Sequence, residues 1–131
     1  PEQLAQVINY LRQHSDVKYL FYNNSDQAGG LPEGLAAAGL SDVQFVTVSP
    51  GLTDLEQIAE GKELASIQNE NFSQGYRAID AGLRILVEGS AGPEKFPDGY
   101  TRILSKANVE PGELPKTPGT PEEYQAAWGL K

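Results

Sequence analysis

The chain has 131 residues with 10 basic and 18 acidic side chains, so its formal net charge is −8. This length fits one domain with a real core, and the acidic balance argues against nucleic acid, because phosphate binding needs a basic surface. The chain has no cysteine, which excludes disulfides, thiol catalysis and cysteine metal sites. No apolar run is long enough to span a membrane. Since the sequence has no methionine and no signal peptide, we expect it to be cut from something longer.

The first 40 residues predict a helix, a strand and a second helix. The helix over residues 1–15 has apolar side chains at the spacing i, i+3, i+4 and i+7: Leu4, Val7, Ile8 and Leu11. Residues 17–22 form a β-branched and aromatic run that predicts a buried strand. Turn-forming residues 23–26 end this strand, and a helix is predicted over residues 29–38.

The same alternation continues to residue 89. Residues 43–48 predict a second strand, and residues 63–68 predict a weaker third one. Between them, Thr53 and Glu56 have capping-box spacing, which predicts that the Thr53 hydroxyl caps a short helix ending at Gly61. A long helix ending at Gly89 is then predicted from its apolar stripe: Phe72, Tyr76, Ile79, Leu83 and Leu86.

The composition changes after residue 89, because six of the nine prolines lie beyond it. Residues 100–105 predict one more strand, and residues 111–119 predict a proline-rich surface tether. A second capping box at residues 120–123 predicts a last short helix that carries Tyr124 and Trp128. We therefore divide the chain into two regions, residues 1–89 and residues 90–131.

This order of elements predicts an α/β fold in three layers, with a mainly parallel sheet and helices on both faces. Ligands of such sheets bind outside the carboxyl ends of the strands, which here selects residues 23–26, 49–51 and 69–71. These segments are rich in neutral polar side chains and poor in cations, so they favour a small, polar, uncharged ligand over a phosphate. On spacing alone, Asn24 and Asn69 either cap the helices that follow or face a ligand.

No pattern of catalytic or cofactor-binding residues is present. His14, the single histidine, stands at the end of the first helix, where a cation interacts favourably with the helix dipole, and no serine or acid is paired with it. The glycines at 29, 30 and 34 match neither GxGxxG nor GxxxxGK, and no residues have metal-ligand spacing. Trp128 is interpreted as a packing anchor.

Three segments carry a resemblance to a known family. Residues 17–40 (VKYLFYNNSDQAGGLPEGLAAAGL) match a strand ending in Asn-Asp, then A-x-G, then a helix ending in A-A-G. Residues 61–69 (GKELASIQN) match a Gly and a strand of the form A-T-I-x-Q, and residues 103–109 (ILSKANV) match a returning strand. In these features the chain resembles the C-terminal part of type I periplasmic binding proteins, the sugar-type substrate-binding components of ABC transporters.

The resemblance implies a solute-binding component of an ABC importer with no enzymatic activity and no cofactor. A small polar ligand, a sugar or sugar-like molecule, would bind in a cleft between two lobes. Residues 1–89 would form an α/β segment of the C-terminal lobe, and residues 90–131 would add the returning strand, tether and final helix. The implied partners are the N-terminal lobe of the parent chain and the transporter permease. The implied location is periplasmic or extracellular, and a lipid-anchored parent is compatible with it.

The resemblance also places the binding residues. Asn24 stands at the family's ligand-binding Asn, and Asn69 stands at its ligand-binding Gln. Pro50 replaces a ligand-binding Asp. Ser49 beside it offers a hydroxyl, and Asp26 or Glu70, at other strand ends, could substitute for the missing acid. The expected ligand-binding residues are therefore Asn24, Asp26, Ser49 and Asn69.

Two alternatives remain from other functional classes. The effector-binding domain of a lactose-repressor-type regulator shares the fold, and a DNA-binding segment in the parent gene would distinguish it. A flavodoxin-like enzyme or receiver module would need a phosphate loop or an acidic cluster after the first strand, and neither appears.

Overall fold

The computed structural model describes residues 2–69, 71–92, 101–116 and 119–130, with the backbone alone for residues 71–73. The chain divides into two compact units: unit 1 comprises residues 1–68 and 103–114, and unit 2 comprises residues 69–102 and 115–131. Residue 89, where the sequence predicts a boundary, lies inside unit 2 and directly follows a long helix.

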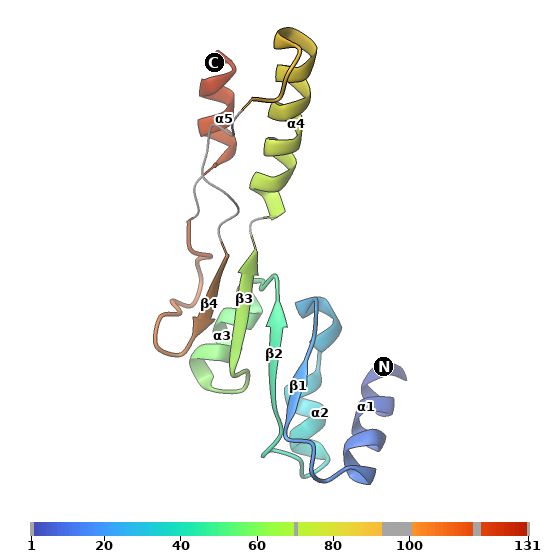
Figure 1. The fold of residues 1–131 in the computed structure, drawn as a ribbon. Helices are drawn as coiled ribbons and strands as arrows, with labels where there is room; N and C mark the ends of the chain where they lie inside the picture. The colour runs from blue at the N-terminus through green and yellow to red at the C-terminus, as the bar shows by residue number, and fades with distance from the viewer. Residues whose placement is uncertain (1, 70, 93–100, 117–118, 131) are drawn as a thin grey trace. The chain divides into compact units, whose positions relative to one another are not determined.

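Four strands form one sheet in the order β1-β2-β3-β4 (Figure 1). They are β1 (Tyr19–Phe21), β2 (Gln44–Val48), β3 (Ala65–Asn69) and β4 (Thr101–Ser105). The pairings β1–β2 and β2–β3 are both parallel, with Leu20 opposite Phe45 and Thr47 opposite Ser66. The prediction of an α/β fold built on a mainly parallel sheet is confirmed. Tyr100, the first residue of the predicted fourth strand, lies outside the described residues.

The helices of unit 1 alternate with the strands as expected. They are α1 (Glu2–Gln13), the 3₁₀ helix η1 (Ser25–Ala28), α2 (Leu31–Ala37) and α3 (Leu52–Glu60). The helix predicted over residues 29–38 thus begins only after Gly30, whose φ of 75° favours glycine.

An apolar cluster joins α1 and α2 to the sheet. Phe45 of β2 is fully buried at 0% exposure, and the cluster includes Leu11 of α1 together with Leu31 and Leu35 of α2. Burying each such side chain contributes about 1.5–3 kcal/mol. A second, smaller cluster packs α3 against β4 through Leu55, Ile58 and Leu104.

The expectation that the first strand is buried is wrong for most of its side chains. Leu20 packs against the apolar cluster, but its neighbours Tyr19 and Phe21 are 70% and 65% exposed. Successive side chains of a strand point to opposite faces, and β1 stands at the edge of the sheet. Ile103 of β4 is also 62% exposed, so the residues described leave these apolar side chains uncovered.

The predicted cap at Thr53 is also wrong. Helix α3 begins at Leu52, with Gly51 in extended conformation as its N-cap, and Thr53 is an exposed residue of the first turn. The carboxylate of Asp54 accepts a hydrogen bond of 2.7 Å from the amide of Gly51. This acid at the third helical position satisfies an otherwise unpaired donor, so the helix begins before the Thr-x-x-Glu pattern.

Unit 2 contains α4 (Asn71–Glu88) and α5 (Pro121–Ala127), which lie side by side (Figure 1). The predicted capping box of α5 is confirmed: the Thr120 hydroxyl accepts from the amide of Glu123 at 3.3 Å, and the Glu123 carboxylate accepts from the amide of Thr120 at 2.9 Å. Long helix α4 ends directly before Gly89, as predicted. Of its predicted apolar stripe, three side chains are exposed: Ile79, Leu83 and Leu86.

Candidate functional site

The expected binding residues follow the ends of three parallel strands. Asn24 and Asp26 come after β1, Ser49 comes directly after β2, and Asn69 is the last residue of β3. The carboxyl ends of parallel strands meet at one edge of a sheet, which is where α/β proteins bind ligands. Asn24, Asp26 and Ser49 belong to unit 1, whereas Asn69 is the first residue of unit 2.

Asn24 has a structural role in the loop after β1. Its backbone is extended, with φ −151° and ψ 131°, and its side-chain oxygen accepts a hydrogen bond of 2.9 Å from the amide of Asp26. The capping interpretation of Asn24 is therefore confirmed for η1. The side chain is exposed, and its role toward a ligand remains a prediction.

A hydrogen bond joins the loops that follow β1 and β2. The hydroxyl of Ser25, which is 8% exposed, donates to the carbonyl of Ser49 at 3.0 Å. The amide of Ser49 donates to the carbonyl of Ile67 at 2.8 Å, which extends the β2–β3 pairing by one bond. Two of the expected site segments are thus held in contact through Ser25, which the sequence analysis did not single out for this role.

Ser49 adopts a backbone conformation that favours glycine. Its φ is 61°, and it is the single non-glycine with positive φ among the residues described. Such a conformation costs on the order of 1–3 kcal/mol and is common at binding sites. The strain lies between the end of β2 and buried Pro50, at one of the four expected binding positions.

A cavity of about 140 Å³ lies beside the loop after β1. Its polar lining comes from Tyr22, Asp26, Gln27 and Gln3, and its apolar lining includes Leu4 and Leu31. Burial raises the pKa of the Tyr22 hydroxyl, so that group stays protonated at neutral pH. This volume is below the roughly 300–1,000 Å³ of usual ligand pockets.

A larger cavity, of about 370 Å³, lies away from the expected site. It opens beside the first residues of β2 and the end of α3, with Leu35 and Val43 among its lining and Glu33 and Lys62 as its charged groups. None of the four expected binding residues lines it.

A buried polar cluster on the covered face of the sheet was missed by the sequence analysis. Thr47 and Ser66 are 0% exposed and Glu63 is 1% exposed. The Thr47 hydroxyl donates to a Glu63 carboxyl oxygen at 2.7 Å and lies 2.7 Å from the Ser66 hydroxyl. The available signal was an alternation in which Thr47 falls on the same face as Phe45, where an apolar residue is expected.

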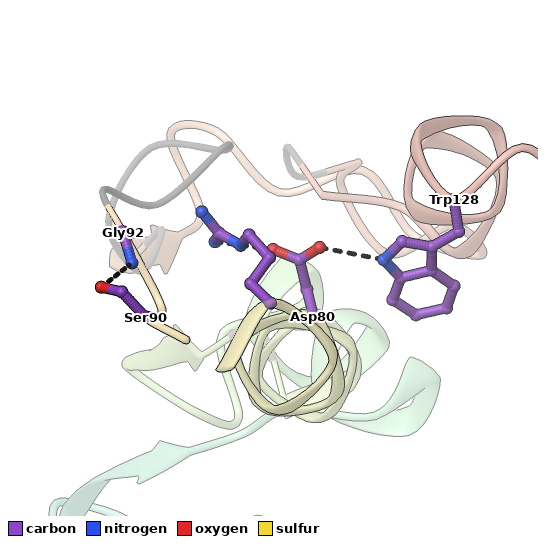
Figure 2. A network of polar contacts seen from close by, with 5 residues as sticks. Asp80, Ser90, Gly92 and Trp128 are labelled. Atoms are coloured by element: carbon purple, nitrogen blue, oxygen red, sulfur yellow. Dashed lines mark hydrogen bonds and ion pairs between the residues drawn. The ribbon is translucent and has the colours of Figure 1, made fainter. Parts of the chain in front are cut away.

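Unit 2 has its own network around Asp80, which is 4% exposed. Its carboxylate accepts a hydrogen bond of 2.9 Å from the indole of Trp128 (Figure 2). The same carboxylate forms an ion pair of 2.7 Å with Arg84. The Trp128 ring stacks on Tyr76 at a centroid distance of 5.9 Å, so its predicted packing role is confirmed. The network joins α4 to the end of α5.

The described ranges contain no group of three or more His, Asp or Glu side chains that could hold a metal ion. Among the helices described, none is long and apolar enough to cross a membrane.

No family model matches the chain, and no curated protein matches it. Eight chains of solved structures do, and one is a protein from Mycobacterium smegmatis with 20% sequence identity and a TM-score of 0.60. The match covers 79% of this chain and 35% of the mycobacterial chain, so this chain spans little more than a third of that protein's length. At this identity the likeness concerns the fold alone.

Proposed function

We propose that this chain is part of the solute-binding component of an ABC importer and binds a small polar, sugar-like molecule at the carboxyl edge of its sheet. In this proposal the protein performs no catalysis. It works in the periplasm or outside the cell, with a second lobe completing the site and the transporter permease receiving the ligand.

The link between the loops after β1 and β2 is the observation that carries this proposal. The Ser25–Ser49 hydrogen bond holds these loops together at the edge where parallel sheets bind ligands. Hydroxyl and amide groups there can both donate and accept hydrogen bonds, which suits the hydroxyls of a sugar. The strained backbone of Ser49 adds support, because strain of this kind gathers at binding sites.

Pro50 limits the kinds of ligand that we expect this site to bind. A proline offers neither a side-chain acceptor nor an amide donor, and Pro50 is buried. Hydrogen bonds to a charged acceptor are worth about 1.5–3 kcal/mol each, and the resembling family has an Asp at this place. We therefore expect weak binding of simple aldopentoses such as ribose and tighter binding of a less hydroxylated or differently shaped molecule.

Calorimetric titration of the protein encoded by the complete gene, with a panel of monosaccharides and related polar solutes, tests the proposal. Asp26→Ala is the informative variant, because Asp26 is one of the residues that line the cavity, whereas the Asn24 side chain caps η1. Its affinity should fall by about 1.5–3 kcal/mol with little change in apo melting temperature. Asp16→Ala, at an exposed position after α1, is the matched control and should bind like the parent.

Three results would count against the proposal. They are binding of no solute in the panel, unchanged affinity in Asp26→Ala, and a DNA-binding segment at the start of the gene, which would favour the regulator alternative. Submicromolar binding of ribose would contradict the interpretation of Pro50 alone.

A further inference from the structure

The carboxyl group of Glu63 is buried, and one of its two oxygens has no hydrogen-bond partner among the described residues. One oxygen accepts from Thr47 at 2.7 Å. The other is inaccessible to solvent and makes no hydrogen bond with any residue that the structure describes. A buried acid in this situation is costly when ionised, because its charge is shared by an oxygen that nothing solvates.

The hydroxyls beside Glu63 supply a single donor to it. Thr47 has one proton and two oxygen neighbours, at Glu63 and Ser66. If Thr47 donates to the carboxyl, Ser66 must donate to Thr47, and the chain of hydrogen bonds ends there. The protonated carboxyl fits this arrangement without a buried charge. The ionised carboxylate receives the Thr47 hydroxyl and a weaker contribution from the Thr47 backbone, but its second oxygen has no donor among the described residues.

The charges around the cluster do not compensate for ionisation. Asp54 of α3 is the charged residue whose interaction with Glu63 is resolved, and its negative charge opposes a second one. Lys62, the next residue, is exposed and forms an ion pair of 2.7 Å with Glu60. Lys106, which follows β4, is exposed and lies near Gly61. Burial, with Asp54 adding to it, raises the pKa of Glu63 to about 7.

We propose that Glu63, Thr47 and Ser66 form a proton-dependent lock between β2 and β3, which is closed when Glu63 is protonated and destabilised when it ionises. Asp54 connects this lock to the candidate site, because its carboxylate also holds the amide of Gly51 in the loop after Ser49. The lock is inferred from the geometry of unit 1 and does not depend on the proposed function.

The direction of the pH effect follows from linkage. The folded-state pKa of Glu63, about 7, lies above its ordinary value of 4.5, so its stabilising effect is complete below pH 4.5. The effect is lost progressively as pH rises to 7. Each pKa unit corresponds to a tenfold change in equilibrium, so the unfolding equilibrium constant should rise on the order of a hundredfold across this range.

The test measures unfolding of the full chain by denaturant between pH 4.5 and 8, with Glu63→Gln and Glu56→Gln compared in the same series. Gln at position 63 keeps the shape and remains neutral, so this variant should lose the pH dependence that the parent shows. Glu56 is exposed on α3, and its variant should retain that dependence. The remaining titratable groups are the same in both variants, so their contributions to the pH dependence cancel when the two variants are compared. Equal pH dependence in the two variants would overturn the proposal.

A second measurement keeps the test decisive if Glu63→Gln does not fold. The side-chain carboxyl carbon of Glu63 can be followed by NMR in the parent protein as pH is varied. A midpoint near 7 supports the lock, and a midpoint near 4.5, the ordinary value, would overturn it.

Discussion

Phe45 and Thr47 stand two residues apart on β2, point to the same face of the sheet and are both fully buried, yet their surroundings differ. Phe45 lies in an apolar cluster with α1 and α2, whereas Thr47 lies in a polar cluster with Glu63 and Ser66. The first arrangement gains stability from area removed from water, which does not depend on pH. The second depends on which groups carry protons. The covered face of this sheet therefore combines a cluster whose contribution to stability is independent of pH with one whose contribution depends on pH.

Phe45→Ala should produce the largest loss, because it leaves a cavity in the apolar cluster. Truncation of a buried Phe costs about 3–5 kcal/mol. Phe21→Ala is a matched control on the neighbouring strand, where the ring is 65% exposed, and should cost under about 1 kcal/mol. Denaturant unfolding at pH 5 and pH 8 should give the same loss for Phe45→Ala at both values. Similar costs for the two variants would show that the two faces of the sheet are not as different as their exposure indicates.

Thr47→Val should have the next largest effect, and the effect should depend on pH. Valine keeps the shape but removes the hydroxyl that donates to Glu63, which costs about 1–3 kcal/mol for an unsatisfied buried group. That hydrogen bond lowers the pKa of Glu63, so its removal raises the pKa further and makes the loss greater at pH 8 than at pH 5. Thr53→Val, on the exposed side of α3, should change little at either pH. Equal losses at the two pH values would separate Thr47 from the ionisation of Glu63.

Asp54→Asn should have a smaller and mixed effect. The carboxylate lies in the first turn of α3, where a negative charge is worth about 0.3–1 kcal/mol, and Asn retains an acceptor for the Gly51 amide. Removing the charge also removes a repulsion, so the pKa of Glu63 should fall toward its ordinary value. The loss should therefore be larger at pH 5 than at pH 8. A Glu63 midpoint unchanged in NMR titration would show that the two carboxyls do not interact.

The two clusters also illustrate which features of the fold could be predicted from the sequence and which could not. The alternation of helices and parallel strands was readable because periodicity is a local property, and each strand lies within two residues of its expected bounds at both ends. The exposure of a side chain, in contrast, is not a local property of the sequence. Tyr19 and Phe21 have the composition of a buried strand, but whether they are covered depends on elements distant in the chain. The burial of Glu63 could not be predicted for the same reason, because its partner Thr47 lies 16 residues earlier in the chain.

The candidate site was predictable in outline for a similar reason. The rule that ligands bind at strand ends requires only the order of elements, and it located the segments containing Asn24, Asp26 and Ser49. Spacing left the cap and the ligand-facing interpretations of Asn24 both open, and it could not indicate that Ser49 would have a φ of 61°. The strand-end rule also gave no sign of the hydrogen bond from Ser25 to Ser49, which joins two loops 24 residues apart.

Gly34→Ala tests how tightly the apolar cluster is packed where α1 meets α2, and we expect the smallest net effect of the four variants. Alanine is better than glycine in a helix by about 1 kcal/mol, which favours the variant. A Cβ at position 34, however, would lie 2.9 Å from Cδ1 of Leu4, so the Leu4 side chain must move. Leu4 is half-buried and can shift at modest cost, and the two terms should leave a loss below about 1 kcal/mol.

A double-mutant cycle separates these two terms. In a Leu4→Ala background the steric conflict is absent, so Gly34→Ala should become stabilising by up to about 1 kcal/mol. The measured coupling between positions 4 and 34 then reports the contact between the helices directly. If Gly34→Ala stabilises the chain equally in both backgrounds, α1 does not approach α2 this closely in solution, and the apolar cluster is looser at this end than the complete burial of Phe45 implies.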